Sequence, residues 1–413
     1  MAVFEKRDIF DIIIVGGGLA GLSLANLLAA QNFSTACVDI SDPKLAMTTG
    51  FDGRTTAISW ASRKVLDAAN IWNDLIPHAN PIDEIQIMDG DSPTLLTFDK
   101  EEVDNRNFGW IIENHLIRKA LYTQARKTEN LTLFAPESVQ DFSIGKQHAK
   151  AILKNGRVLQ APLIIGADGR NSFTREWMGI STRGWSYKQQ AIVCNVVHEN
   201  PHNNIAIENF REQGPFAVLP MTNDEQGRNR SSVVWTEHAV NKNSSALNYD
   251  DTVFNAALNA RFPDFYGEVE LTGQRFSFPL GLKHAHNYIA PRMALVAEAA
   301  HAMHPIAGQG LNMGFRDIAK LADLLIAARE DGVDLGSNAL LHSYQSARRM
   351  DNMGMMAATD GLNKLFGSRL PGIGMARLLG VRAVSGFAPA KQFFMKQAMG
   401  AAGVLPQLLK DAS

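Results

Sequence analysis

The sequence predicts an α/β fold in which a parallel-sheet domain is interrupted by an antiparallel sheet and followed by a helical tail. Near the N-terminus an apolar strand, Ile9–Val15, leads through a glycine-rich turn into a helical pattern, Leu19–Gln31. From about 181 to 285 the chain changes to short strands. A strand at Ala294–Ala297 and a helical pattern from Leu311 to about Ala328 then return to the strand-and-helix pattern of the N-terminal part. One domain is therefore expected to be built from two separated parts.

Length and composition fit a large globular protein. At 413 residues we expect two packed domains, or one large domain with an extension. Hydrophobic residues make up 46% and charged residues 20%, which argues against disorder and against a fibrous repeat. The 40 Lys and Arg nearly balance the 42 Asp and Glu, so overall charge gives no attraction to nucleic acid. Cys37 and Cys194 lie in apolar runs, which disfavours disulfides and suits a reducing compartment.

One uncharged stretch, Ile12–Ala30, is long enough for a membrane span or a signal segment. It contains three consecutive glycines and Gly21, and Asp8 and Asp11 lie directly upstream. This pattern favours a buried strand, a tight turn and a packed helix over a helix in lipid. We therefore reject both membrane alternatives.

The glycine-rich turn matches a dinucleotide-binding pattern. It reads G-x-G-x-x-G, it follows a strand and opens a helix, and Asp39 ends the next strand. Glycines let the backbone approach a pyrophosphate, and Asp39 can accept a hydrogen bond from a ribose hydroxyl. The alternative is a turn that only packs helix against strand. The context favours an adenine dinucleotide in a Rossmann-like domain and leaves NAD and FAD open. The residues expected to bind it are Gly16, Gly18, Leu19, Ala20, Gly21 and Asp39.

Two later segments make the pattern specific. Ala167–Arg175 follows an apolar strand, and Ala297–Asn312 contains an acid, two histidines and a glycine-rich end. In this order and spacing, the three segments resemble those of the FAD-dependent aromatic hydroxylases and, more narrowly, of the ubiquinone-biosynthesis hydroxylases. The resemblance extends from residue 8 to about 360. Its further matching stretches are Phe51–Ile58, Gly214–Pro220, Phe278–Leu280, and Tyr344 with Arg348 and Asp351.

The resemblance implies that FAD is the cofactor and NAD(P)H a transient co-substrate. The glycine turn and Asp39 would hold the ADP half of FAD. Asp168 would lie near the pyrophosphate, with a second role toward NAD(P)H left open. A carboxylate of the third segment would meet the ribityl chain, and the residues after Gly308 would meet the isoalloxazine ring. The further residues implied along the cofactor are Arg54, Asn114, Glu298, Pro305, Gly310, Leu311 and Asn312.

The third segment has a helix start that suits binding of the flavin ring. It differs from the family pattern at one pair of residues. A helix beginning near Leu311 would aim free N–H groups at the N1 and O2 edge of the flavin, which favours an anionic reduced flavin. The family has Gly-Asp, or Gly-Asn in part of the quinone branch, where this chain has Ala297-Glu298. Glu298 is one methylene longer, so its bond to the ribityl chain must be re-aimed, and Ala297 adds a methyl group beside the cofactor.

Several residues have simpler alternatives. His301 and His304 lie three apart, but Pro305 follows and no acidic or cysteine ligand set lies nearby, so we expect no metal site. We expect instead a structural histidine at the flavin edge, or a proton carrier. Asp168-Gly169 alone would also suit a turn at a strand end. Arg54 alone would also suit a solvated loop cation.

Local patterns complete the prediction. Helical spacing predicts helices at Ala57–Ala69 and Asn114–Lys127, with Asn114 as the N-cap of the second. The tail methionines Met350, Met353, Met355 and Met356 are expected to fill the core. The chain is divided into residues 1–180 (first part of the FAD-binding domain), 181–285 (antiparallel-sheet substrate domain), 286–360 (second part of the FAD-binding domain) and 361–413 (helical tail).

The resemblance implies an FAD-dependent monooxygenase that hydroxylates a polyprenyl phenol in ubiquinone biosynthesis with NAD(P)H and O2. NAD(P)H would reduce FAD and leave, because no second G-x-G-x-x-G follows a strand. No catalytic side chain can be named. The alternatives are a soluble flavin hydroxylase of a small aromatic compound and a non-catalytic, flavin-bound scaffold of a quinone-biosynthesis complex. Ring position, prenyl length, NADH or NADPH preference and oligomeric state stay open.

A prenylated substrate resides in lipid, so the expected location is the cytoplasm with peripheral attachment to the inner face of a membrane, or to a quinone-biosynthesis complex. The tail from Leu365 to Leu409 mixes apolar and basic residues, which suits such docking. A basic amphipathic segment packed on its own domain is the alternative.

Overall fold

The computed structural model describes residues 8–90, 95–211, 214–238, 245–304, 308–366, 380–381 and 384–410. One of its layers is a six-stranded sheet in the order β18-β19-β12-β1-β2-β8, in which all neighbours pair in parallel except β18 and β19. The strands are β1 (Ile12–Val15), β2 (Thr35–Val38), β8 (Leu131–Phe134), β12 (Leu163–Gly166), β18 (Ile289–Ala290) and β19 (Met293–Leu295).

Both faces of this sheet are covered, which explains its apolar strand sequences. Successive side chains of a strand point to opposite faces. Ile12 and Ile14 pack with helices on one face, whereas Ile13 and Val15 pack on the other face with the three-stranded sheet β11-β10-β9. The covering elements are α1 (Leu19–Ala30), α3 (Trp60–Ala68), α5 (Asn114–Lys127), α8 (Gln309–Glu330), β9 (Val139–Ile144), β10 (Ala149–Leu153) and β11 (Val158–Ala161).

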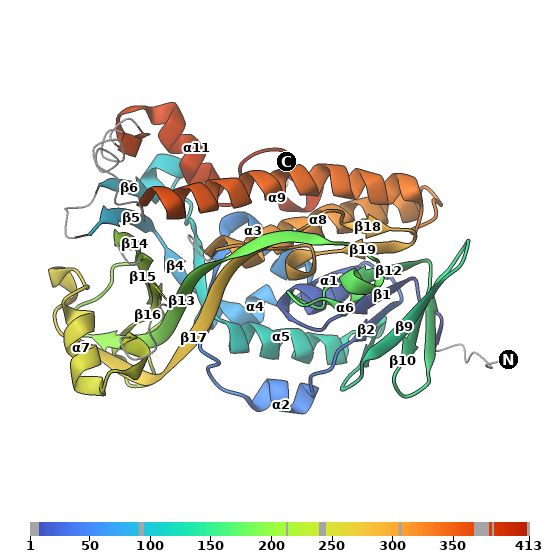
Figure 1. Cartoon of the computed structure of the whole chain (residues 1–413), viewed down its shortest axis with the longest axis horizontal. Coiled ribbons are helices and arrows are strands. Elements are labelled where there is room, and N and C mark those ends of the chain that lie inside the picture. The colour runs from blue at the N-terminus through green and yellow to red at the C-terminus, as the bar shows by residue number, and fades with distance from the viewer. Residues whose placement is uncertain are drawn as a thin grey trace.

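A second sheet of eight strands has the order β20-β17-β13-β16-β15-β14-β5-β6. Figure 1 shows it beside the parallel sheet, with the long strands β13 and β17 extending toward that domain. Phe254 and Leu258 of helix α7 (Asp251–Asn259) pack into its core. The strands are β5 (Glu84–Asp89), β6 (Leu96–Asp99), β13 (Thr182–His198), β14 (Ile205–Arg211), β15 (Gly214–Met221), β16 (Asn229–His238), β17 (Val269–Ala285) and β20 (His301–Ala302).

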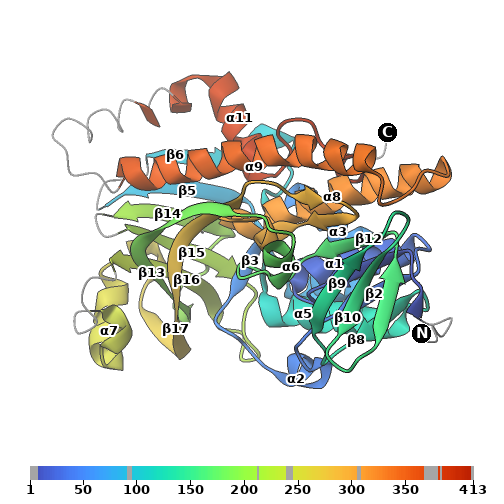
Figure 2. The same cartoon turned by 45° about the vertical axis from the view of Figure 1, so that its right-hand side comes forward.

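Smaller elements connect the two sheets. Strands β3 (Thr55–Ser59), β7 (Gly109–Glu113) and β4 (Asn80–Ile82) form a sheet of their own. The 29-residue helix α9 runs along the outside of the molecule with α11 near it, as the two views agree (Figures 1 and 2). The other helices are α2 (Pro43–Thr48), α4 (Trp72–Leu75), α6 (Phe173–Trp177), α9 (Asn338–Phe366), α11 (Ala388–Ala398), and the 3-10 turns η2 (Ile76–His78), η3 (Lys100–Val103), η5 (Ala246–Asn248), η6 (Asp264–Tyr266), η7 (Ala297–Ala299) and η9 (Gln407–Leu409).

The C-terminal residues return to the parallel-sheet domain. The backbone N–H of Ala61 donates to Met399 O over 3.0 Å. Arg316 on α8 donates to Ala402 O over 3.1 Å. The Asp323 carboxylate, also on α8, accepts the backbone N–H groups of Gln407 and Leu408. This part of the predicted tail is therefore packed on its own domain.

Three local predictions need correction. The predicted helix Ala57–Ala69 begins only at Trp60, because Thr55–Ser59 is strand β3, paired with β7. Asn114 is the first residue of α5, not its N-cap, because its side chain instead accepts a hydrogen bond from Thr56 Oγ1 over 2.6 Å. Met356 is buried as predicted, but Met350 and Met353 are 69% and 41% exposed.

The predicted domain division stays a prediction, although several elements bear on it. β13 begins at Thr182 and β17 ends at Ala285, close to the expected limits of the inserted sheet. The inserted sheet also takes β5 and β6 from before it and β20 from after it. Residue 360 lies inside α9. Among the described residues, none of the helices combines the length and the apolarity that a membrane span requires.

Candidate functional site

The glycine-rich turn between β1 and α1 forms an open cradle. Gly16 has φ +108°, and a Cβ there would lie 2.4 Å from Ala167 O, so only glycine fits. A Cβ on Gly18, by contrast, would meet nothing within 4 Å. Gly18 is the N-cap of α1, no described side chain caps this end, and the first turn contains no acid. The free N–H groups of a 12-residue helix therefore face open space, which fits the pyrophosphate of a dinucleotide.

Asp39 holds this turn in place. Its carboxylate accepts hydrogen bonds from the backbone N–H of Gly17 and, over 2.7 Å, from that of Ser41. A carboxylate offers roughly four acceptor positions. Two remain for the ribose hydroxyls that the sequence predicts as partners of Asp39.

The second segment lies directly beside the first. Ala167 donates its backbone N–H to Val15 O over 2.7 Å. Both oxygens of Asp168 are used within the turn, since they accept from Thr174 N (2.9 Å), Thr174 Oγ1 (3.0 Å) and Ser172 Oγ. Asp168 thus holds the turn at Gly169 against α6. A contact of Asp168 with the cofactor would use the remaining lone pairs of its oxygens or the backbone of this turn.

The third segment joins the same edge of the sheet. Val296 donates its backbone N–H to Gly166 O over 3.0 Å. The next residue, Ala297, has φ +52° and begins the η7 turn. The Glu298 side chain is 57% exposed, with its carboxylate 3.6 Å from Arg170 Nη2. All three predicted segments therefore converge at the carboxyl edge of the parallel strands, where ligands bind in open α/β sheets.

The start of α8 is a second uncapped helix terminus. Gly308 is its N-cap with φ +62°, no described side chain caps it, and the first turn contains no acid. A Cβ on Gly310 would meet nothing within 4 Å. The Asn312 side chain points inward, because it donates to Ala57 O (2.8 Å) and Gly308 O (3.1 Å) and accepts from Ser59 N (3.0 Å). Asn312 thus connects α8 with β3. Because its side chain makes these bonds, the predicted contact of Asn312 with the isoalloxazine ring would be made by its backbone.

The remaining predicted residues lie around this edge. Leu19 and Ala20 open α1, and Leu311 is in the first turn of α8. The Arg54 side chain is 54% exposed, with its guanidinium carbon 5.8 Å from the centre of the Phe278 ring. Arg54 therefore faces the inserted sheet. Pro305 lies outside the described residues.

Buried histidines flank the third segment. His301 is 2% exposed, and its Nε2 lies 2.6 Å from Asp317 Oδ2. His304 is 1% exposed and contacts the Tyr187 ring. Burial lowers the pKa of His304 to about 4, although Asp360 opposes this shift. Among the described residues, no group of three or more histidine, cysteine or acidic side chains could hold a metal ion.

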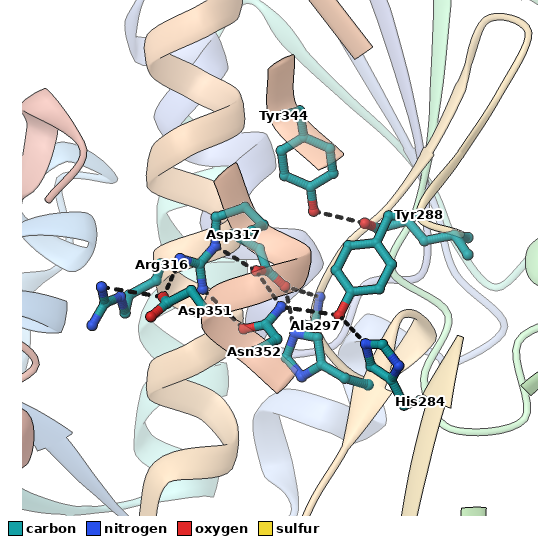
Figure 3. Close-up of polar contacts among 11 residues, drawn as sticks. His284, Tyr288, Ala297, Arg316, Asp317, Tyr344, Asp351 and Asn352 are labelled. Atoms are coloured by element: carbon teal, nitrogen blue, oxygen red, sulfur yellow. Dashed lines mark hydrogen bonds and ion pairs between the residues drawn. The ribbon is translucent and has the colours of Figure 1, made fainter. Parts of the chain in front are cut away.

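The sequence analysis did not single out Asp317. Its carboxylate contacts Ala297 N, His301 Nε2 and Arg348 Nε (Figure 3). Tyr344, Arg348 and Asp351 entered the prediction only as residues that match the family. In the structure, Arg348 Nε donates to Asp317 Oδ1 over 2.8 Å, Asp351 pairs with Arg348, and Tyr344 donates to Leu295 O. The available signal was an acid at helical spacing from apolar residues of α8, four positions from both Met313 and Leu321.

Comparison with known proteins identifies the class. A family model described as an FAD binding domain matches residues 10–359. The chain therefore belongs to this family, and the predicted FAD cofactor is confirmed. Solved structures show the same fold: p-nitrophenol 4-monooxygenase PnpA of Pseudomonas putida is 16% identical with a TM-score of 0.76, over 96% of this chain and 100% of that one. PqsL of Pseudomonas aeruginosa is 21% identical with a TM-score of 0.77, over 91% and 100%.

Curated relatives narrow the family further. Ubiquinone hydroxylase UbiL of Rhodospirillum rubrum is 41% identical over 96% of this chain and 91% of the relative. The 3-demethoxyubiquinol 3-hydroxylase of Escherichia coli is 31% identical over 94% and 98%, and the ubiquinone biosynthesis monooxygenase COQ6 of Xenopus tropicalis is 31% identical over 94% and 92%. The chain is thus a member of the ubiquinone-biosynthesis hydroxylases within the FAD-dependent aromatic hydroxylases. The predicted resemblance, fold class and enzyme class are confirmed.

Proposed function

We propose that this chain hydroxylates the aromatic ring of a polyprenyl phenol on the route to ubiquinone, using FAD, NAD(P)H and O2. The observation that carries the proposal is the convergence of three separated segments at one edge of the parallel sheet, in a chain 41% identical to a ubiquinone hydroxylase. Bound FAD, once reduced by NAD(P)H, supplies the activation of O2 and the transfer of one oxygen atom to the ring.

The residues of the chain bind and orient the cofactor in this proposal. The N–H groups at the start of α1 receive the pyrophosphate, and Asp39 receives the ribose hydroxyls. The N–H groups at the start of α8 would hold the N1 and O2 edge of the flavin ring and would stabilise negative charge there. The first turn of α8 contains no acid that would oppose this charge. Glu298 and the η7 turn meet the ribityl chain.

The inserted sheet contributes the wall of the site opposite the flavin-binding edge. Thr55 Oγ1 donates to Ser232 Oγ over 3.0 Å, which connects β3 to β16. Phe51 and Phe276 meet edge to face with ring centres 5.7 Å apart. A Cβ on Gly53 would lie 2.2 Å from the Phe276 ring, so glycine allows this close approach. These contacts hold the sheet against β3 and the segment before it, and in this proposal the sheet restricts the access of water to the reaction.

Substrate-dependent oxidation of NAD(P)H tests the proposal. The purified protein, reconstituted with FAD, is mixed with NADH or NADPH and with short-chain demethoxyubiquinol-type phenols. We expect faster oxidation with substrate and a product that has gained one oxygen atom. Stimulation only by small aromatic acids would favour the soluble hydroxylase. Flavin binding without stimulation by any phenol would favour the scaffold.

We further propose that the chain docks peripherally on an anionic lipid surface through α11 and Phe387 directly before it. Phe387, Phe393 and Phe394 are 60%, 54% and 44% exposed. Lys396 on α11 is exposed and α11 contains no acidic residue, which complements anionic lipid, whereas Lys391 pairs with Glu102 over 2.6 Å. Lipid is also where a prenylated substrate resides.

Vesicle flotation tests this docking. We expect the full chain to float with vesicles of phosphatidylcholine and phosphatidylglycerol, and less with phosphatidylcholine alone. The double variant Phe393→Ser, Phe394→Ser should remain at the bottom of the gradient. The control is Val253→Ser, which removes a 48%-exposed apolar side chain from α7, at a distance from α11 in both views (Figures 1 and 2). Equal flotation of all three proteins would exclude this surface.

A further inference from the structure

A single fully buried carboxylate lies behind the third segment of the flavin site. Asp317, on α8, is 0% exposed. Its Oδ2 accepts the backbone N–H of Ala297 over 3.0 Å and lies 2.6 Å from His301 Nε2. Its Oδ1 accepts from Arg348 Nε over 2.8 Å and from Asn352 Nδ2 over 3.1 Å (Figure 3). One side chain therefore connects the turn after β19 with α8 and α9.

The charge of Asp317 is stable in this position. Burial alone would raise the pKa of its carboxyl group, but His301 and Arg348 outweigh burial and hold the pKa at about 2. Arg348 also pairs with Asp351 and donates to Asn352 Oδ1 over 2.9 Å. The buried ion pair thus has its hydrogen bonds satisfied, which is the condition for tolerating such a pair in a core. An ionised carboxylate only accepts hydrogen bonds, so the ring of His301 donates.

The group that Asp317 holds adopts an unusual conformation. Ala297 has φ +52°, the left-handed region that residues other than glycine occupy only when their surroundings hold them there. Its methyl group faces α8, because a Cβ on Gly314 would lie 2.7 Å from it. The expectation that the methyl group lies beside the cofactor stays a prediction. The hydrogen bond from Ala297 N to Asp317 holds the start of this turn, and Arg175 Nη1 donates to Ala299 O at its end over 2.8 Å.

Helix α9 supports the same arrangement from outside. Tyr344, Arg348 and Asn352 are spaced by four residues, so they share one face of α9. Tyr344 donates to Leu295 O over 2.7 Å at the end of β19. Asn352 also donates to Tyr288 Oη over 3.2 Å. The strand before the turn and the turn itself are thus held by one helix face.

We propose that Asp317 is a positioning residue of the flavin site, which fixes the Ala297–Glu298 turn and the His301 ring and so sets how the turn meets the cofactor. Asp317 is too deeply buried to touch the cofactor itself, and it acts through Ala297 and His301. The inference rests on the proposed contact between the η7 turn and FAD. It also explains how alanine occupies the position where the family has glycine.

A rescue experiment distinguishes positioning from general stabilisation. Asp317→Asn is expected to weaken FAD binding about tenfold or more, the range for loss of a hydrogen bond to a charged group. Ala297→Gly in the same protein should restore most of the affinity, because glycine adopts the left-handed conformation without being held. Ala297→Gly alone is measured as well and gives the reference affinity against which the rescue in the double variant is judged. FAD dissociation constants come from fluorescence titration of the apoprotein, alongside the visible absorption spectrum of the bound flavin.

Asp323→Asn is the matched control on the same helix. The Asp323 carboxylate accepts the backbone N–H groups of Gln407 and Leu408, so its loss should lower the melting temperature without changing FAD affinity. Unchanged FAD affinity in Asp317→Asn, or failure of Ala297→Gly to restore it, would overturn the inference. If Asp317→Asn does not fold, His301→Asn takes its place, with weaker FAD binding and a shifted flavin spectrum expected. Wild-type protein that binds no FAD would refute the proposed function instead.

Discussion

The packing of the η7 turn against α8 can be tested by removing the methyl group of Ala297 and adding one at Gly314. A Cβ on Gly314 would lie 2.7 Å from the Cβ and 3.3 Å from the Cα of Ala297, so the two positions cannot both be alanine without movement. The perturbation is a set of three variants: Gly314→Ala, Ala297→Gly, and the double variant that combines them.

Magnitudes follow from three effects. Alanine in a helix interior is favoured over glycine by about 1 kcal/mol, and overpacking of a core costs about 1–3 kcal/mol. A contact of 2.7 Å puts the overpacking cost at the upper end, about 3 kcal/mol, and the helix gain offsets about 1 kcal/mol of it, so Gly314→Ala should lose about 2 kcal/mol of unfolding free energy. Ala297→Gly relieves roughly 1 kcal/mol of left-handed strain but gives the unfolded chain more freedom, so its net effect should be near zero. The double variant removes the overlap and keeps the helix gain, so it should be about 1 kcal/mol more stable than wild type.

The coupling between the two substitutions is the measured quantity. Urea unfolding of the apoprotein, followed by tryptophan fluorescence, gives the free energies of the wild type and the three variants. The values above predict a coupling of about 3 kcal/mol in favour of the double variant. If the double variant were as unstable as Gly314→Ala, the two effects would be additive, and the contact between the turn and α8 would be refuted.

Three further predictions concern the cofactor cradle, the buried histidine and the second segment. Gly18→Ala should weaken FAD binding without lowering the stability of the apoprotein, because a Cβ there meets no protein atom within 4 Å; equal affinity in a titration would contradict the open cradle. The pKa of His304 falls from 6.5 to about 4 on folding, so its contribution to stability is complete above pH 6.5 and is lost as pH falls toward 4. This loss amounts to about 2 kcal/mol between pH 8 and pH 5, and His304→Gln should be less sensitive to pH by that amount in urea unfolding. Asp168→Asn should destabilise the protein by about 1 kcal/mol, since it weakens the bonds to Thr174, whereas an unchanged urea midpoint would speak against this role.

The sequence predicted the parts of the site that local backbone geometry dictates. The strand, glycine turn and helix at Ile12–Ala30 were recognisable because glycine spacing and apolar runs are properties of neighbouring residues. The order of the three segments identified the family, and the structure places them at one edge of the sheet. The predicted contacts of individual residues with FAD stay predictions.

Local patterns failed where a distant partner decided the outcome. Ala57–Ser59 belongs to strand β3 because β7 pairs with it, although these residues were predicted as the start of a helix. The Asn312 side chain is turned inward because Ser59 and Ala57, over 250 positions earlier, provide its partners. Met350 and Met353 are exposed because only one face of α9 packs on the protein.

The sequence by itself determined the dinucleotide turn, because its glycines and acid act within one strand-turn-helix unit. The class of the protein and the expectation of FAD followed from the resemblance carried by three short segments in order. Only the tertiary structure decided which way the Ala297 methyl group points and which carboxylate holds the turn. The physical reason is that a buried charge needs partners from several elements at once, and Asp317 finds them on the η7 turn, β20 and α9.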